Sequence, residues 1–258
     1  MKIVGFAQLR NELEQGNLHG WITSMLTICD CVYIYDQNST DYSKDVYLQH
    51  PNLHVIYSPV NDFSNEIKCK ATLLRKAKAE QPDADWFFWM DGDTLLDGRI
   101  IKESLHTQLT QSTQNTADAV SFGHFNLWRS DIWARLDNAY NGIHERGVVC
   151  LWKNKEELEF SEEGGLHNPQ YPLQINNVVR FPYVLIHRGF ATDESIIRKY
   201  NIYKERGQSG WDLDRLLDEE TLKVGKIPYS SIPDYFLIND TVNPVNKKKL
   251  KDIYEGEH

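Results

Sequence analysis

Two carboxylates separated by one glycine, Asp91-Gly92-Asp93, directly follow a continuous apolar segment at residues 86–90. Both carboxylates can turn toward one cation, and the glycine lets the backbone bend and lets a diphosphate approach closely. Hard divalent cations such as Mg²⁺ and Mn²⁺ prefer oxygen ligands and often keep phosphate oxygens in their shell. A metal held here would offset the charge that grows on a departing diphosphate. The alternative is an ordinary Asp-Gly-Asp turn.

Alternating strands and helices are expected to position these carboxylates. Apolar strands are predicted at residues 2–7, 31–35, 53–57 and 86–90, with helical periodicity over 18–29 and 67–79. This alternation predicts an α/β fold with a mostly parallel sheet and helices on both faces. Ligands bind beyond the carboxyl ends of strands in such sheets. The polar segments at residues 8–12, 36–38 and 91–93 should therefore meet at one edge.

The remainder of the chain is expected to complete the same domain. Residues 107–117 are polar and are interpreted as a surface connection. Strands are predicted near 119–122, 148–152 and 183–186, and helices at about 194–203 and 213–222. The predicted division is a donor-binding half at 1–106, an acceptor and catalytic half at 107–240, and a charged tail at 241–258 whose last dozen residues fray.

Charge and cysteine content narrow the class of partner. The chain has 28 Lys and Arg against 37 Asp and Glu, a net charge of −9, which argues against a nucleic-acid partner. The basic residues at 247–251 are interpreted as a solvated tail, with weak contact to an anionic membrane surface as the alternative. No apolar run approaches the roughly 20 residues that span a bilayer. Four cysteines without zinc spacing predict free thiols and a cytoplasmic protein.

The order of these motifs resembles the Rossmann-like GT-A fold, and family 2 glycosyltransferases of bacterial and viral type in particular. The matching segments are Arg10-Asn11-Glu12, residues 35–41, residues 86–93 and Leu185-Ile186-His187-Arg188-Gly189-Phe190, and the resemblance covers roughly residues 1–225. It implies a metal-dependent, inverting glycosyltransferase. Such an enzyme would move a sugar from a nucleotide diphosphate sugar, with a UDP-sugar favoured, to a glycan or other hydroxyl acceptor.

The resemblance also implies roles for residues of the donor side. Asp36 would accept a hydrogen bond from the base of the donor, with capping of its own turn as the alternative. Asp91 would lie near the ribose and the metal, and Asp93 would bind Mn²⁺ or Mg²⁺ directly. Lys70 is placed where such enzymes have a basic donor contact, unless it is a solvated helix lysine, and Arg10 joins the donor-binding set.

Residues of the later segments are assigned in the same way. His187 is a candidate third metal ligand, since a neutral imidazole fits beside two carboxylates on Mn²⁺, and a structural histidine is the alternative. Arg188 could pair with diphosphate oxygens in a fork geometry.

An inverting transferase also needs a general base. The Glu-Asp pair that opens a helix in family 2 members is not recognisable here, which leaves the base open. Asp137 is the first choice, followed by Glu145 and Asp131. His167 is predicted to line the acceptor pocket or to contact the donor sugar. For each of them, an ordinary surface position is the alternative.

Two other functions compete with this reading. A sugar-phosphate nucleotidyltransferase also uses metal-binding aspartates, but it would normally carry a glycine-rich basic loop after the first strand, and residues 8–12 contain no glycine. A non-catalytic nucleotide- or glycan-binding module would have little reason to combine Asp36, two metal carboxylates and His187. A dehydrogenase is disfavoured because no G-x-G-x-x-G follows the first strand.

Overall fold

The computed structural model describes residues 1–61, 66–114, 116–137, 144–161, 171–205, 207, 209, 211–220 and 222–256. The chain divides into two compact units. Unit 1 comprises Met1–Leu96, Ile100–Phe122 and Gly147–Tyr183, and unit 2 comprises Asp97–Arg99, Gly123–Arg146 and Val184–His258. The described strands form an eight-stranded sheet in the order β3-β2-β1-β4-β8-β6-β9-β5 and a two-stranded sheet of β10 and β7.

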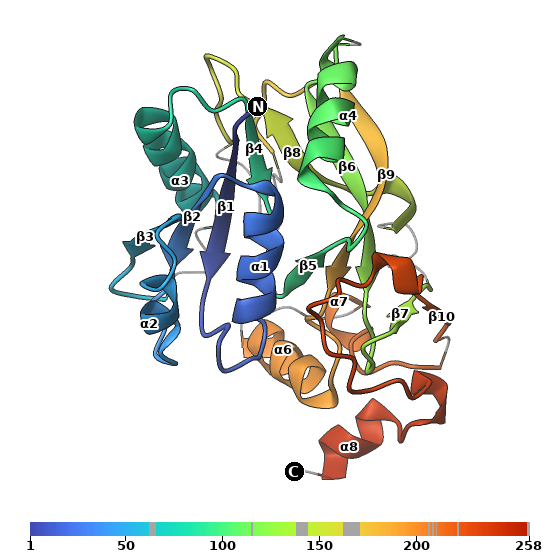
Figure 1. Cartoon of the computed structure of the whole chain (residues 1–258). Helices are drawn as coiled ribbons and strands as arrows, with labels where there is room; N and C mark the ends of the chain where they lie inside the picture. The colour runs from blue at the N-terminus through green and yellow to red at the C-terminus, as the bar shows by residue number, and fades with distance from the viewer. Residues whose placement is uncertain are drawn as a thin grey trace. The chain divides into compact units, whose positions relative to one another are not determined.

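Parallel strands form the first half of the large sheet, and Figure 1 shows them side by side. β1 pairs in parallel with both β2 and β4, and β2 pairs in parallel with β3. β8 then runs antiparallel to β4 and to β6. The strands are β1 Ile3–Leu9, β2 Cys31–Asp36, β3 Leu53–Tyr57, β4 Trp86–Trp89, β5 Thr94–Leu96, β6 Ala119–Asn126, β8 Val148–Lys153 and β9 Val178–His187. The predicted α/β fold is confirmed.

Helices cover both faces of the parallel strands, as a sheet of apolar strands requires. Val4 and Phe6 of β1 belong to one core cluster with Leu73 of α3. Gly5, the residue between them, lies against the other face, where an added Cβ would be 2.6 Å from Met25 Cε of α1. The helices of unit 1 are α1 Leu18–Ile28, α2 Ser43–Tyr47, α3 Glu66–Glu80 and α4 Lys102–Gln114.

The surface connection predicted at residues 107–117 is wrong, because α4 occupies most of this segment. Among the described side chains of α4, only Leu105 and Leu109 are buried, both fully, while the residues around them are polar. Two leucines four residues apart lie on one face of a helix, and this face packs on the rest of unit 1. A helix with such a narrow apolar face has the composition of a loop.

Unit 2 contains α6 Asp193–Glu205, α7 Trp211–Asp214 and α8 Leu250–Gly256, with β7 Trp133–Arg135 pairing antiparallel to β10 Val224–Lys226. Short 3-10 turns lie at Tyr229–Ser231 and Pro244–Asn246. The helix predicted at 194–203 is confirmed as α6, whereas the one predicted at 213–222 is wrong in extent, because α7 ends at Asp214. No described helix has the length and apolar character needed to cross a membrane.

The C-terminal segment packs on the rest of unit 2, so the frayed tail predicted from its charge is wrong. Leu250, the first residue of α8, is fully buried in a cluster with Trp128, Phe190, Ile196 and Leu216. The basic residues before it have partners: Lys247 contacts the Arg129 carbonyl and Asp240, and Lys249 donates to the Glu219 carbonyl at 3.3 Å. The burial of Leu250 and the contacts of Lys247 and Lys249 therefore hold the segment in place although it is highly charged.

Candidate functional site

The carboxyl ends of β1, β2 and β4 form one edge of unit 1, as the parallel registers require. β2 and β3 continue the sheet on one side of β1, and β4 lies on the other side. The strand order therefore changes direction at β1. In open α/β sheets a ligand crevice lies outside the carboxyl ends at such a point. Leu9 ends β1 opposite Asp36, and Asp91 follows closely after the end of β4.

The loops after β1 and β2 are tied to each other. The backbone N–H of Asn11 donates to Ser39 Oγ at 3.0 Å, and the Thr40 N–H donates to Asn11 Oδ1 at 2.8 Å. Asn11 and Asn38 both have positive φ, at 54° and 58°, a conformation that asparagine tolerates better than most residues. These bonds hold the two loops in a fixed arrangement at the strand ends.

The Asp91-Gly92-Asp93 turn lies tightly against the end of β1. A Cβ added at Gly92 would be 2.6 Å from Leu9 Cδ2 and 2.9 Å from Glu12 Cδ, so a larger residue requires these side chains to move. The Thr94 N–H donates to the Asp91 carbonyl at 3.1 Å and closes the turn. Asp91 is exposed and Asp93 half-buried. The close approach of the backbone to β1 thus requires a glycine between two accessible carboxylates.

A buried lysine contacts a tryptophan that is hydrogen-bonded to this turn. Lys70 of α3 is 3% exposed, pairs with Glu66 at 2.6 Å, and places its ammonium 4.5 Å from the centroid of the Trp89 ring. The Trp89 indole N–H donates to Asp91 Oδ1 at 2.8 Å. The reading of Lys70 as a solvated helix lysine is therefore wrong.

Several buried polar atoms at the ends of β1 and β2 have no hydrogen-bond partner among the described residues. They are both amide atoms of Gln8, Nε of Arg10 and Oδ2 of Asp36, and the Tyr47 hydroxyl beside Asp36 is a further such atom. Asp36 is fully buried, and its other oxygen accepts a hydrogen bond from the Ser39 N–H at 2.9 Å. Burial, followed by the nearby charge of Asp36, raises the pKa of Tyr47, which places the phenol beside this carboxylate. Unsatisfied buried polar groups each cost about 1–3 kcal/mol, so these strand ends are suited to polar ligand groups. Gln8 and Asp36 lie on opposite faces of the sheet, because Gln8 pairs with Tyr35 and Asp36 pairs with Leu9.

His187 and Arg188 belong to unit 2, where each has a local partner. His187 Nε2 lies 3.3 Å from Lys199 Nζ, and its ring lies 5.4 Å from that of His124. An ammonium donates to a neutral imidazole nitrogen, so Nε2 would have to leave Lys199 before binding a metal. The Arg188 guanidinium lies 4.8 Å from the ring centroid of Phe236.

Metal binding by the predicted set stays a prediction. Asp91 and Asp93 belong to unit 1 and His187 to unit 2. Within the described ranges, no three His, Cys, Asp or Glu side chains are grouped so that they could hold a metal ion. The donor chemistry of the turn nevertheless suits a hard cation, because it presents two accessible carboxylates on a backbone fixed by close packing.

The structure gives Asp137, the first choice for the general base, another role. It is 4% exposed and binds the Arg135 guanidinium through both oxygens, at 2.9 and 3.0 Å from Arg135 Nε. The Lys223 N–H also donates to it at 3.3 Å. Arg135 in turn stacks on Trp128, with its guanidinium 4.3 Å from the ring centroid. These contacts favour a stabilising role for Asp137. The sequence contains the signal for this pair, since residues two apart at a strand share a face.

The other residues proposed for the acceptor side differ in their surroundings. Asp131 is 8% exposed, and its Oδ2 accepts the N–H groups of Asn239 and Asp240 at 2.8 and 3.0 Å, which is a structural arrangement. Glu145 is exposed. His167 lies outside the described residues.

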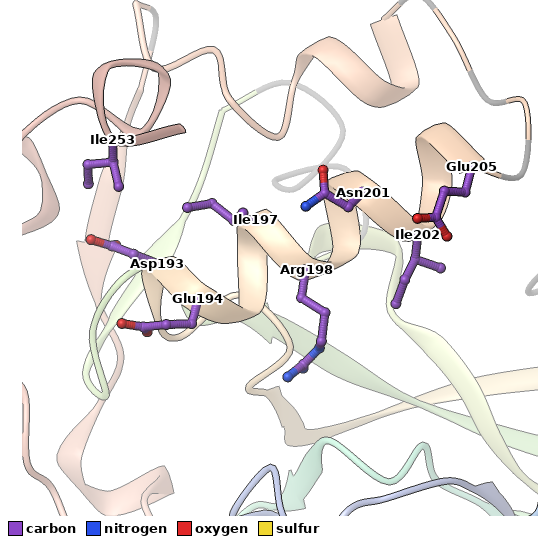
Figure 2. A pocket seen from close by; sticks show the side chains of 8 residues that line it. All are labelled: Asp193, Glu194, Ile197, Arg198, Asn201, Ile202, Glu205 and Ile253. Atoms are coloured by element: carbon purple, nitrogen blue, oxygen red, sulfur yellow. The ribbon is translucent and has the colours of Figure 1, made fainter. Parts of the chain in front are cut away.

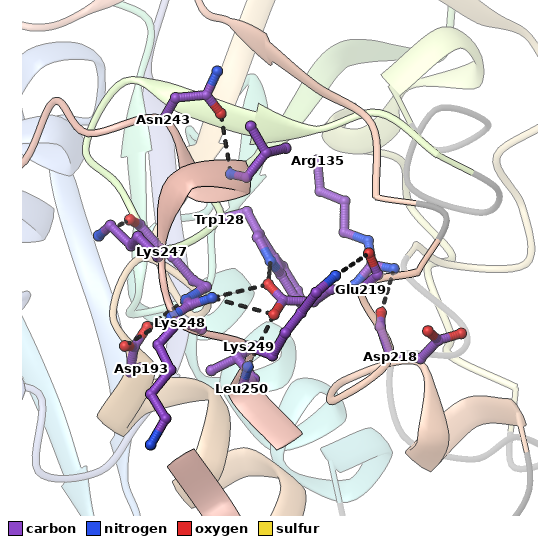
Figure 3. Close-up of polar contacts among 12 residues, drawn as sticks. Trp128, Arg135, Asp193, Asp218, Glu219, Asn243, Lys247, Lys248, Lys249 and Leu250 are labelled. Carbon is purple, nitrogen blue, oxygen red and sulfur yellow. Dashed lines mark hydrogen bonds and ion pairs between the residues drawn. The ribbon is translucent and has the colours of Figure 1, made fainter. Parts of the chain in front are cut away.

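A buried arginine is the centre of a polar network in unit 2 that sequence reasoning missed, and Figure 3 shows its partners Asp193 and Glu219. Arg129 is 1% exposed and binds Asp193 at 2.5 and 3.0 Å and Glu219 at 3.1 and 3.2 Å. Glu219 also accepts the Trp128 indole N–H at 3.1 Å and the Leu250 N–H at 3.0 Å. The network therefore joins four segments of unit 2 that are distant in sequence.

A hollow beside this network is lined by α6 and one residue of α8 (Figure 2). Its lining residues are Asp193, Glu194, Ile197, Arg198, Asn201, Ile202, Glu205 and Ile253. None of the residues predicted to bind donor, acceptor or metal lines it, so it is separate from the predicted chemistry.

Comparison with known proteins gives structural likeness without a family. No protein-family model and no curated protein matches the chain. It is similar to 4-diphosphocytidyl-2C-methyl-D-erythritol synthase from Anaerococcus prevotii DSM 20548, with 14% identity over 90% of this chain and 89% of that chain, and a TM-score of 0.32. It is also similar to a protein described as a nucleotide-diphospho-sugar transferase from Desulfovibrio desulfuricans G20, with 11% identity over 83% and 95% of the two chains and a TM-score of 0.39.

A further likeness is to a glycosyltransferase involved in the glycosylation of the major capsid of PBCV-1, with 11% identity over 48% of this chain, 52% of that chain and a TM-score of 0.25. Likeness at this level does not decide between sugar transfer and nucleotide transfer.

Proposed function

We propose that the protein is a metal-dependent glycosyltransferase that moves a sugar from a nucleotide diphosphate sugar to a hydroxyl acceptor. The observation that carries this proposal is the set of unsatisfied buried atoms of Gln8, Arg10 and Asp36 at the ends of β1 and β2. They lie where α/β sheets bind ligands, and the next strand end carries the Asp91-Gly92-Asp93 turn.

Each group at this edge has a task in binding the donor. Asp36 Oδ2 would accept an N–H of the base. A uracil ring presents an N–H that suits such an acceptor, which favours a UDP-sugar. Arg10 and Lys70 add positive charge to the donor side, Lys70 through its contact with Trp89.

Asp91 and Asp93 would hold Mn²⁺ or Mg²⁺, and Gly92 leaves room for the diphosphate beside them. The metal, when bound, would supply Lewis-acid stabilisation of the leaving nucleotide. His187 as a third ligand and Arg188 as a diphosphate contact are further parts of the proposal.

On the acceptor side, a carboxylate would take the proton of the attacking hydroxyl, with inversion at the anomeric carbon. Because Asp137 and Asp131 are held in structural contacts, the exposed Glu145 becomes the first candidate for this base. Asp137 remains the second candidate, and His167 is proposed to contact the acceptor or the donor sugar.

The first test is a thermal-shift panel of nucleotides and nucleotide sugars, each with Mn²⁺, Mg²⁺ or EDTA. A ligand at 100 times its dissociation constant adds about 2.7 kcal/mol of stability, which is readily measured. We expect one nucleoside diphosphate to stabilise the protein with Mn²⁺ or Mg²⁺, and Asp93→Ala to abolish the metal-dependent part. No shift with any nucleotide and any metal would refute the proposal.

Asp36→Asn tests the base contact with almost no change of shape. Asparagine has one acceptor oxygen for two donors, the Ser39 N–H and the base N–H, so one of them loses its partner. We expect at least about tenfold weaker nucleotide binding, which corresponds to about 1.4 kcal/mol. Asp45→Asn, the same substitution at an exposed residue of α2, is the matched control. Equal affinities of the two variants would remove Asp36 from the site.

Product analysis separates sugar transfer from nucleotide transfer. A glycosyltransferase releases a nucleoside diphosphate from the nucleotide sugar when an acceptor is supplied. A nucleotidyltransferase releases pyrophosphate from a nucleoside triphosphate and a sugar phosphate. Pyrophosphate release that depends on Asp93 would establish the nucleotidyltransferase alternative and overturn the proposed reaction.

A further inference from the structure

Trp89 occupies an unusual position at the edge of unit 1. It is the last residue of β4, 9% exposed, and its ring belongs to the core cluster on the α3 face. Its indole N–H nevertheless reaches past the strand and donates to Asp91 Oδ1 at 2.8 Å. The ring is therefore anchored in the core at one side and bonded to an exposed carboxylate at the other.

The face of this ring is held by Lys70. The ammonium lies 4.5 Å from the ring centroid and is itself fixed by Glu66 at 2.6 Å. A desolvated cation is attracted to the electron-rich face of an indole. It also draws electron density from the ring, which makes the N–H a stronger donor. Glu66, Lys70, Trp89 and Asp91 thus form a continuous relay from α3 to the carboxylate turn.

Two constraints act together on Asp91. The tight packing of Gly92 against Leu9 and Glu12 fixes its backbone, and the indole fixes its side-chain rotation. The indole is neutral and binds one oxygen of an exposed side chain, so it leaves the second oxygen of the carboxylate for a cation. A preorganised carboxylate binds a cation more tightly than a rotating one, because less conformational entropy is lost on binding.

We propose that Trp89 is a positioning residue of the divalent-cation site, and that Lys70 acts on this site through the indole rather than by touching the donor. The inference rests on the proposed function, since it presumes that Asp91 takes part in cation binding. It adds a role for a residue of the 86–93 segment to which the sequence analysis assigned none.

The test measures Mn²⁺ binding directly, from the electron paramagnetic resonance signal of free Mn²⁺, with and without UDP. Trp89→Phe keeps an aromatic face for Lys70 and removes the N–H donor. Loss of such a supporting contact typically lowers metal affinity about 10–100-fold, and we expect a loss in this range. Trp133→Phe is the matched control, because it removes an indole N–H that donates to the Thr241 carbonyl of unit 2 at 3.1 Å.

A double-mutant cycle with Asp91→Ala separates positioning from general damage. The proposal requires that Trp89→Phe weakens Mn²⁺ binding in the wild-type background and has no further effect once Asp91 is absent. An equal loss in both backgrounds would show that the ring acts by another route and would overturn the proposal. Trp89→Met, which also lacks the donor, replaces Trp89→Phe in the cycle if the latter unfolds at the assay temperature.

The wild-type measurement distinguishes the two levels of failure. If the wild type binds no Mn²⁺ with or without UDP, the metal-dependent function and the role of Trp89 both fail. If the wild type binds Mn²⁺ and Trp89→Phe binds it equally well, the proposed function stands and the positioning role is refuted.

Discussion

Replacing Glu219 with alanine should remove about 3–5 kcal/mol from the free energy of unfolding, since it breaks a buried ion pair from one side. Glu219 is 6% exposed and faces the Arg129 guanidinium at 3.1 and 3.2 Å. It also accepts the Trp128 indole N–H and the Leu250 backbone N–H (Figure 3). The substitution therefore leaves a buried cation with less compensation and two buried N–H donors without an acceptor.

The contacts around Arg129 narrow the expected loss of unfolding free energy in Glu219→Ala. Arg129 keeps Asp193 and the Lys248 carbonyl, the latter at 2.7 Å, so its charge is not left alone. The two orphaned N–H donors add about 1–3 kcal/mol each when no water replaces the lost oxygen. The retained partners of Arg129 lower the expected loss of unfolding free energy and the two orphaned donors raise it. We therefore expect Glu219→Ala to lose about 4 kcal/mol, in the middle of the starting range. Glu219→Gln keeps the shape and one acceptor oxygen, and because charge-assisted bonds are roughly twice as strong as neutral ones, about half of this loss is expected.

Urea denaturation, followed by tryptophan fluorescence and by circular dichroism, measures these differences. Glu220→Ala is the control, because Glu220 is the neighbouring, exposed glutamate and its removal should change stability by less than about 0.5 kcal/mol. The midpoint should shift while the slope with urea stays constant, if only stability changes. A Glu219→Ala variant within about 1 kcal/mol of this control would refute the view that the network holds the C-terminal segment on unit 2.

Three further predictions concern other parts of the molecule. Gly92→Ala should destabilise the protein by about 1–3 kcal/mol in urea titrations, because its Cβ would meet Leu9 at 2.6 Å; an unchanged midpoint would contradict the close packing. Burial acts to raise the pKa of Asp118, but hydrogen bonds from Lys155 and two backbone amides hold it below its ordinary value of 3.8. Because the folded-state pKa of Asp118 is lowered, the stabilisation is present at neutral pH and is lost as the pH falls through this folded-state pKa. The loss of about 1 kcal/mol expected for Asp118→Asn at pH 7 should therefore shrink toward pH 3 in thermal melts. A stability difference between wild type and variant that stays constant with pH would contradict the ion pair. Burial raises the pKa of Cys31 to about 11 and also raises the pKa values of Cys29 and Cys150. An aromatic disulfide reagent at neutral pH should therefore modify the four buried cysteines only after unfolding. Rapid labelling of the native protein would contradict their burial.

The first half of the fold could be predicted because its signals are local. Continuous apolar runs bounded by polar turns identify β1 to β4, and the strand predicted at residues 53–57 has the observed bounds of β3. The meeting of the strand ends follows from parallel pairing alone. The site residues that depend on this rule, such as Asp36 and Asp91, could be named from the sequence for the same reason.

The second half depends on contacts between distant residues, and its sequence predictions were poorer. The charged C-terminal segment gives no local sign that Lys247 and Lys249 have partners or that Leu250 enters a core cluster. Those partners come from Arg129, Glu219 and Asp240, and only the fold brings them together. In α4, two buried leucines were too few to show the helix period against a polar background.

One local pattern could have sharpened the choice among the aspartates. Asp97, Asp137 and Asp91 each bond to a residue two positions away in the sequence. Asp97 and Asp137 bind arginines through both oxygens and are 2% and 4% exposed, so their charge is neutralised inside the protein. Asp91 is exposed, and the partner of its side chain is a neutral indole. A carboxylate that is held in place but keeps its charge is suited to a cation from solution, and this difference in partner, more than the Asp-Gly-Asp spacing, supports a metal role for Asp91.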